Sequence, residues 1–252
     1  MAKKIPYGLT DYFRIVTEDF YYVDKTKYIE DLEKTAAFLF LIRPRRFGKS
    51  LFLNMLNCYY DVKYADRFEE LFGNQYIGKH PTAEQGKYLV LRFNFSMVRA
   101  TDDKLEAAFN RHISLETAYF ASVYASYFKP DFQEQLKLIP EAAGRLEYIC
   151  LCAKEQGLSI YLLIDEYDNF TNTILSSKGN DVYHSLTHDS GFYRSFFYVV
   201  KGVTTGAEAP VKRMFITGVS PVTLDDVTSG FNIGTNITTD ERFNSMVGFS
   251  ES

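Results

Sequence analysis

Four short apolar runs along the chain predict the strands of a central sheet. Residues 37–42 and 160–164 are apolar throughout, which indicates strands buried on both faces. Residues 88–95 alternate between apolar and polar positions toward their end, so we expect this strand nearer a sheet edge. A fourth run, Met214 to Ile216, follows Arg213 and ends at Thr217 and Gly218. Because longer stretches of helical spacing separate these runs, the pattern is typical of an α/β protein with a mainly parallel sheet.

Helical spacing fills most of the chain between these strands. The helix expected from Lys49 onward has its apolar residues on one face: Leu51, Phe52, Met55, Leu56 and Tyr59. The other expected helices run from Asp102 to about Tyr127, from beyond Pro140 to a stop at Gly157, and from Phe192 to Lys201. We expect a loop at 204–210, and the residues after Gly218 show no clear pattern.

Composition indicates a globular chain without a strong electrostatic bias. Its length of 252 residues suggests one large domain, or a core with a small appendage. The chain is 46% hydrophobic, and its formal net charge of −4 gives no global attraction to nucleic acid. Three cysteines argue against a disulfide framework, and Cys150 and Cys152 lack a second cysteine or histidine cluster, which favours two small helical residues over a metal half-site. The N-terminus has no signal-peptide pattern, and the longest apolar stretch, Ala36 to Ile42, is far too short to span a membrane. We therefore expect a cytoplasmic protein.

The strongest candidate for chemistry lies between the first strand and the helix that follows. Backbone N–H groups at a helix N-terminus bind phosphates, Lys49 would reach the terminal phosphates, and the Ser50 hydroxyl would bind Mg²⁺. The usual pattern has glycine five residues before Gly48, where this chain has Arg43. The alternative is a basic surface turn before an ordinary helix. The predicted nucleotide-binding residues are Arg43, Pro44, Arg45, Arg46, Phe47, Gly48, Lys49, Ser50 and Leu51.

A second candidate is the acidic pair Asp165-Glu166, directly after the apolar run 160–164. Ligands of open α/β sheets bind at the carboxyl ends of strands, and adjacent carboxylates there are costly to bury without a cation. Asp165 would hold Mg²⁺, usually through water, while Glu166 would orient and deprotonate the attacking water. The alternative is a helix N-terminus that favours acidic residues. Thr217 would sense the γ-phosphate or hold that water, with Ser220 or a plain turn as alternatives.

Arginines near these motifs have several interpretations. The cluster beside the phosphate loop would contact phosphates, pair with acids of a neighbouring subunit, or form a solvated turn; it comprises Arg43, Arg45 and Arg46. Arg194 and Arg213 are interpreted as structural ion-pair residues in preference to arginine fingers.

At these residues the chain resembles the AAA-ATPase-like family of bacterial and archaeal P-loop proteins, whose members often carry a C-terminal PD-(D/E)XK nuclease-like domain. The matching stretches are Lys4–Gly8, Tyr21–Thr26, Phe40–Ser50, Tyr161–Asp168, Phe192–Phe197 and Phe215–Pro221. The resemblance implies a three-layer P-loop NTPase fold of the ASCE or AAA type, with the Thr217 strand between the phosphate-loop strand and the Asp165 strand. It places Tyr22–Thr26 near the nucleotide base. It also makes Arg43 the family's own residue at the usual glycine position.

Together the motifs and the resemblance predict an ATPase with ATP and Mg²⁺ as ligands. Glu166, Lys49 and Thr217 are the expected catalytic residues, in Walker A and Walker B motifs and a sensor strand, and Ser50 and Asp165 are the expected metal ligands.

The resemblance also gives expectations for the whole chain. Residues 1–36 would form an N-terminal cap and 37–252 the ATPase core, with the helical lid and nuclease-like domain of relatives absent after Ser252. An alternative function is a nucleotide-dependent switch or interaction module with little turnover, acting with DNA or a nuclease-like partner. A homo-oligomer is compatible with both. A small-molecule kinase is disfavoured because hydrolases of this kind place the water-activating acid at the strand end.

Overall fold

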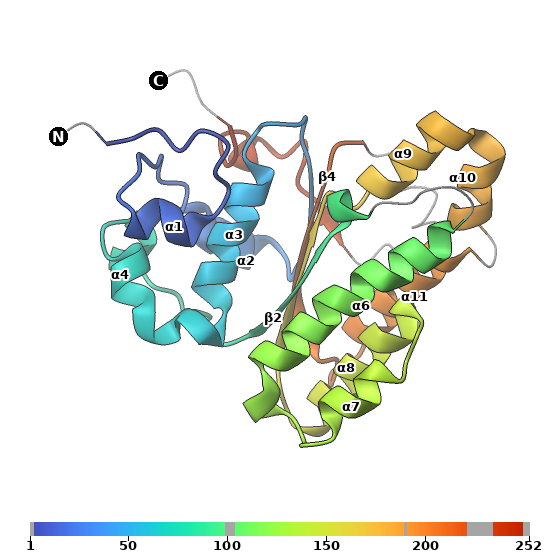
Figure 1. Cartoon of the computed structure of the whole chain (residues 1–252). Helices are drawn as coiled ribbons and strands as arrows, with labels where there is room; N and C mark the ends of the chain where they lie inside the picture. The colour runs from blue at the N-terminus through green and yellow to red at the C-terminus, as the bar shows by residue number, and fades with distance from the viewer. Residues whose placement is uncertain (1–2, 99–103, 189–190, 221–233, 249–252) are drawn as a thin grey trace.

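A single parallel sheet forms the centre of the computed structural model, which describes residues 3–98, 104–188, 191–220 and 234–248 (Figure 1). The strand order is β2-β3-β4-β1-β5, and every pairing is parallel. The strands are β1 Phe38–Ile42, β2 Leu89–Asn94, β3 Ile160–Asp165, β4 Val211–Gly218 and β5 Thr235–Asn236. The four predicted strands are confirmed, β2 lies at an edge as expected, and β4 lies between β1 and β3. The predicted α/β class with a parallel sheet is therefore confirmed, consistent with a P-loop NTPase-like fold.

Helices cover both faces of the sheet and give three layers (Figure 1). One face is covered by α1 Tyr12–Thr17, α2 Tyr28–Thr35, α3 Lys49–Tyr60, α4 Phe68–Phe72 and α5 Tyr76–Lys79. The other is covered by α6 Leu105–Val123, α7 Phe132–Lys137, α8 Ala142–Glu155 and α11 Phe192–Thr204. Between β3 and α11 lie α9 Asn169–Lys178 and α10 Asn180–Thr187. Short 3-10 turns occupy η1 Val62–Arg67, η2 Phe95–Met97, η3 Ala125–Tyr127 and η4 Glu241–Phe243.

Alternate residues of the strands divide the buried side chains into two cores. On β3, Tyr161 and Leu163 pack in the core on the α3 side, whereas Leu162 and Ile164 pack in the core on the α6 side. Both faces of this strand are buried, which explains why its sequence is apolar throughout. The same alternation directs Asp165, two residues after Leu163, to the face that carries α3 and the phosphate loop.

Several helices depart from their expected bounds. The helix predicted from 102 begins at Leu105 and ends at Val123, because the chain continues as a 3-10 turn; Asp102 itself lies outside the described residues. Helix α11 continues three residues past Lys201, to Thr204. Helices α9 and α10, rich in Asn, Ser and Thr, were not predicted, and neither were the short helices α1, α2, α4 and α5. Cys150 and Cys152 are free cysteines in α8, as expected for helical residues.

Two segments distant in sequence pack beside the α3 layer. Helices α1 and α2, from the expected cap, bury Tyr12, Ile29 and Leu32 in the same core as α3. The segment 234–248 runs beside β1, where the Ile237 N–H donates to the Phe40 carbonyl at 2.9 Å. This arrangement brings residues 12–35 and 234–248 to the layer that contains α3 (Figure 1). Within the described ranges, no helix combines the length and hydropathy needed to cross a membrane.

Candidate functional site

The loop between β1 and α3 exposes a row of unpaired backbone donors. Gly48 precedes α3 with a φ of 83°, a left-handed conformation that glycine adopts without steric cost, and Arg46 has a φ of 68°. In the described parts of the chain, the N–H groups of residues 45–51 donate to no acceptor. Consecutive free N–H groups at a helix N-terminus form an anion-binding concavity. The loop is therefore suited to a phosphate chain.

Lys49 lies at the start of α3 and is only 4% exposed. Its ammonium group donates to two carbonyls of the loop, Arg43 O at 2.9 Å and Pro44 O at 3.0 Å. Burial lowers the pKa of Lys49, whereas the nearby carboxylates of Glu166 and Asp165 act to raise it. The loop lysine and the acidic pair therefore share one electrostatic environment.

The ends of β3 and β4 are joined through one hydroxyl group. Thr217 Oγ1 donates to Asp165 Oδ1 at 2.7 Å, and the Glu166 N–H donates to Thr217 Oγ1 at 3.3 Å. Asp165 is 1% exposed and Thr217 is fully buried. Thr217 thus contacts both members of the acidic pair, because β4 is the neighbour of β3 in the sheet.

Glu166 occupies the first position after β3 in an uncommon backbone conformation, with a φ of 51°. Its carboxylate accepts a hydrogen bond from Asn169 Nδ2 at 3.0 Å. Burial, and secondly the charge of Asp165, raise the pKa of Glu166; Lys49 and Arg45 act in the opposite direction. A carboxyl group in this setting holds a proton to a higher pH than an exposed one, which is a property of general bases.

Asp168 is a residue of this site to which the sequence analysis assigned no role. It is fully buried and accepts hydrogen bonds from the backbone N–H groups of Val219 at 3.0 Å and Ser220 at 2.5 Å. The Tyr167 hydroxyl donates to the Ser220 carbonyl at 2.6 Å. These contacts fix the chain after β4 against the turn after β3. The residues joined by these hydrogen bonds lie about fifty positions apart in the sequence, so no local pattern could predict the contacts. In the sequence, only the family resemblance over Tyr161–Asp168 pointed to Asp168.

The structure separates the candidate arginines. The Arg43 guanidinium bonds to the Thr238 carbonyl and to Asn244 Oδ1, so it joins the end of β1 to the C-terminal segment. Arg45 is exposed and lies close enough to Glu166 to lower its pKa. Arg213 lies near the start of β4, at the opposite end of the strand from Thr217, with its Nε 3.6 Å from Glu84. Arg194 is part of α11.

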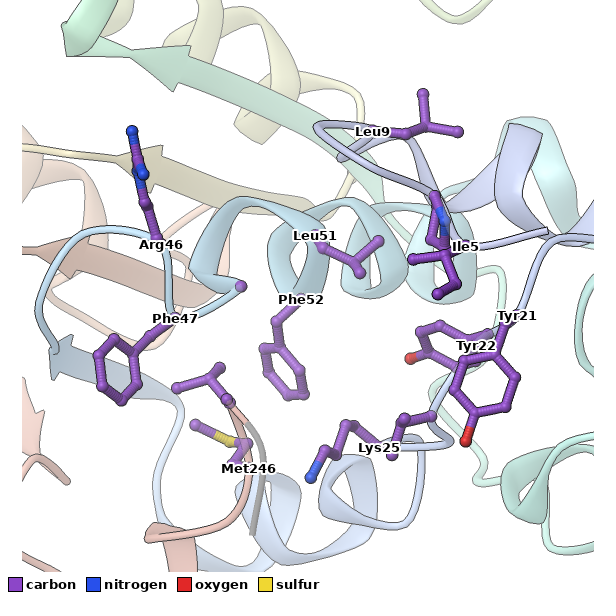
Figure 2. A pocket seen from close by; sticks show the side chains of 15 residues that line it. Ile5, Leu9, Tyr21, Tyr22, Lys25, Arg46, Phe47, Leu51, Phe52 and Met246 are labelled. Carbon is purple, nitrogen blue, oxygen red and sulfur yellow. The ribbon is translucent and has the colours of Figure 1, made fainter.

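An apolar cavity of about 250 Å³ adjoins the phosphate loop (Figure 2). Gly48 and Leu51 line it from the loop and α3, Tyr22 and Lys25 from the N-terminal segment, and Met246 from the C-terminal segment. In Figure 2 the side chains of Leu51, Tyr22, Lys25 and Met246 lie around Phe52, whereas Arg46 extends away from them. Lys25 Nζ donates to the Ser245 carbonyl at 2.7 Å, and burial lowers the pKa of this lysine. An apolar cavity with a few polar groups fits a flat aromatic ring.

Comparisons with known proteins give one family and one relative. The family model described as Predicted AAA-ATPase matches residues 6–228. The chain is 27% identical over 257 residues to the "Uncharacterized protein in vnfD 5'region" of Azotobacter chroococcum mcd 1, an alignment that covers 99% of this chain and 43% of the relative. The chain therefore spans less than half the length of this curated relative. No solved structure matches the chain.

Proposed function

The chain belongs to the predicted AAA-ATPase family, and from this premise we propose that it binds ATP with Mg²⁺ and hydrolyses the γ-phosphate. The observation that carries the proposal is the juxtaposition of two groups. The unpaired N–H groups of residues 45–51 and the buried Lys49 lie beside the linked cluster of Thr217, Asp165 and Glu166. A triphosphate needs the first group and its hydrolysis needs the second.

Phosphate binding is assigned to residues 43–51. The N–H groups would donate to phosphate oxygens, and these oxygens would replace the Arg43 and Pro44 carbonyls as acceptors for the Lys49 ammonium. Arg45, exposed and close to Glu166, would add charge beside the γ-phosphate. The Arg43 side chain would act indirectly, because it is bonded to the segment 234–248.

Metal binding is assigned to Ser50 and Asp165. Mg²⁺ is usually bound by one or two protein ligands, and phosphates and waters complete its coordination shell. The hydroxyl of Ser50 and the carboxylate of Asp165 match this preference. The ion would neutralise charge that develops on the phosphates. Asp165 is almost fully buried, and its Oδ1 accepts a hydrogen bond from the Thr217 hydroxyl. Its other oxygen, Oδ2, lies 4.0 Å from Arg92 Nη2, beyond hydrogen-bond distance, and would face the ion.

Water activation is assigned to Glu166, which lies at the strand end with a raised pKa. Its carboxylate would accept a proton from the attacking water as the water oxygen bonds to the γ-phosphorus and the bond from that phosphorus to the β–γ bridging oxygen breaks, which releases ADP and inorganic phosphate. The Thr217 hydroxyl accepts from the main-chain N–H of Glu166 and donates to Asp165. Thr217 would therefore position the Glu166 carboxylate relative to Asp165.

The base of the nucleotide is assigned to the apolar cavity beside Gly48 and Leu51. This position continues from the phosphate loop, and it includes Tyr22 and Lys25 of the segment that resembles the family's base-proximal stretch. Apolar surface buried there would contribute to the affinity for the base without contacting the triphosphate.

Replacement of Glu166 by Gln tests the catalytic assignment. We expect Glu166→Gln to bind ATP as the unsubstituted chain does and to lose phosphate release by roughly 100-fold or more, because a general base contributes about 10²–10⁴-fold. Glu106→Gln, an exposed position on α6, is the matched control and should hydrolyse ATP normally. Hydrolysis at the original rate in Glu166→Gln would overturn the role of this residue.

The same pair of assays addresses the alternative function. ATP binding by the unsubstituted chain without phosphate release would favour a nucleotide-dependent switch, acting with DNA or a nuclease-like partner, over an ATPase.

A further inference from the structure

Arg92 in the middle of β2 is a charged side chain on the buried side of an edge strand. Its neighbour two positions earlier, Val90, packs in the core on the α3 side, so the alternation of the strand directs Arg92 to that same face. In the sheet, Arg92 is paired in register with Leu163, two residues before Asp165. The arginine is therefore a diagonal neighbour of Asp165, on the face that carries the phosphate-loop helix.

The contacts of Arg92 reach both predicted metal ligands. Arg92 Nη1 donates to Asn54 Oδ1 at 2.8 Å, and Asn54 Nδ2 donates to the Ser50 carbonyl at 2.8 Å. On the other side, Arg92 Nη2 lies 4.0 Å from Asp165 Oδ2. A continuous path therefore runs from the first turn of α3, through Asn54 and Arg92, to the end of β3.

The chemistry of the guanidinium group suits this position. Asp165 is 1% exposed, and among the described residues Arg92 is the cation that forms an ion pair with it. A buried carboxylate needs such a partner. Because the guanidinium fork is planar and rigid, one side of it can hold Asn54 while the other faces Asp165. A lysine ammonium would supply the charge without fixing both directions.

We propose that Arg92 is a positioning residue that sets Asp165 and Ser50 at the spacing Mg²⁺ requires. The inference rests on the proposed ATP and Mg²⁺ binding, and it assigns a role to a strand residue outside both motifs. Arg92 contacts no nucleotide in this account. It acts through Asn54 on the carbonyl of Ser50 and through its charge on Oδ2 of Asp165.

The test measures ATP affinity with Mg²⁺ and with a chelator, so it does not depend on turnover. In Arg92→Met, ATP affinity in chelator should stay within about twofold of the unsubstituted chain. The Mg²⁺ concentration that gives half of the maximal enhancement of ATP binding should rise about 10-fold or more, which is the range typical of residues that orient metal ligands. In Arg92→Lys, this Mg²⁺ concentration should lie between the values for the unsubstituted chain and for Arg92→Met. Arg92 and Lys63 both line one cavity, so Lys63→Met removes a nearby cation and should change neither value.

A second variant protects the test against a folding defect in Arg92→Met. Asn54→Ala leaves the Arg92 charge in place and breaks the path to Ser50, so it should shift the Mg²⁺ dependence in the same direction. Unchanged Mg²⁺ dependence in a folded Arg92→Met or in Asn54→Ala would overturn this inference alone. An unsubstituted chain that binds no ATP would overturn the proposed function and this inference with it.

Discussion

Glu166 shows how a single residue gains its chemistry from its surroundings. Its φ of 51° turns the chain sharply after β3, and its main-chain N–H is held by Thr217 while its carboxylate stays half-buried. Such a backbone conformation is costly for a residue with a side chain, and it persists where the neighbouring structure fixes it. The hydrogen bonds of Thr217 and Asp168 supply that constraint on either side of the turn.

The pH dependence of hydrolysis should report the raised pKa of Glu166. A general base works when deprotonated, so activity should fall as pH decreases through this pKa, and the acidic limb should lie above the ordinary value of 4.5. Because Arg45 lowers the pKa of Glu166, Arg45→Gln should move the limb to higher pH. The measurement is a pH profile of kcat/KM, with substitution of the exposed Arg14 on α1, Arg14→Gln, as control. An acidic limb that moves to lower pH in Arg45→Gln would contradict the prediction.

Gly218 has a steric role beside Thr217. A Cβ atom at this position would lie 2.2 Å from Tyr167 Cε1, in a closely packed region. Gly218→Ala should therefore lower stability by about 1–3 kcal/mol, the usual cost of overpacking. Gly202→Ala is the matched control, because a Cβ there meets nothing within 4 Å and alanine favours the helix by about 0.5–1 kcal/mol. Thermal unfolding of both variants checks the prediction, and equal melting temperatures would contradict it.

Between elements, the site depends on the order of strands in the sheet. β4 lies between β1 and β3, so the end of β4 is beside the phosphate loop on one side and the acidic pair on the other. The Arg43 N–H donates to the Gly218 carbonyl at 3.1 Å, and the Tyr167 N–H donates to the Thr217 carbonyl at 3.0 Å. The last two residues of β4 are thus bonded to both motifs at once.

Thr217→Val should separate binding from hydrolysis. Valine keeps the shape of threonine and removes the donor to Asp165 and the acceptor for the Glu166 N–H. We expect ATP binding to persist, phosphate release to fall by roughly tenfold or more, and stability to fall by about 1–3 kcal/mol as buried polar groups lose a partner. The buried Thr204, on α11, provides the control Thr204→Val, which should lose comparable stability without the loss of turnover. Full phosphate release by Thr217→Val would contradict this role.

The elements themselves were largely predictable from the sequence. Residues 38–42 of β1 and 160–164 of β3 are wholly apolar because both faces of these strands are covered, and α3, α6, α8 and α11 follow apolar spacing. Helices α9 and α10 were not predicted because polar residues dominate them. The short helices α1, α2, α4 and α5 were also not predicted, and β5, with two residues, is too short to show an alternating pattern. The roles of Asp168 and Arg92 were not predicted because their contacts join residues from 38 to about 70 positions apart, and such contacts leave no local sequence pattern.

At the scale of the whole molecule, the candidate site draws on both ends of the chain. Residues 5–25 and 246–248 meet beside α3 and line the cavity next to the phosphate loop. The Lys25 bond to Ser245 spans 220 positions and joins these two segments directly. A nucleotide bound there would therefore contact three parts of the chain together, and its binding free energy would stabilise their common arrangement.

Substitution of Leu51 tests whether the nucleotide base binds in the cavity. Its side chain is half-buried and lines the cavity, so Leu51→Gln should weaken ATP binding by about 10-fold, in keeping with the lost burial of one leucine. Inorganic tripolyphosphate, which has no base, should bind both proteins equally. Leu115→Gln replaces an exposed leucine on α6 and serves as the control. An equal loss of affinity for ATP and for tripolyphosphate would place the base elsewhere.

The most direct test of the account is the position of the triphosphate in a crystal structure of Glu166→Gln with ATP and Mg²⁺. We predict phosphate oxygens within hydrogen-bond distance of the N–H groups of residues 45–51, with the ion held by Ser50 and facing Asp165. A triphosphate bound away from this loop, or an ion on the opposite side of the sheet from α3, would contradict the central claim.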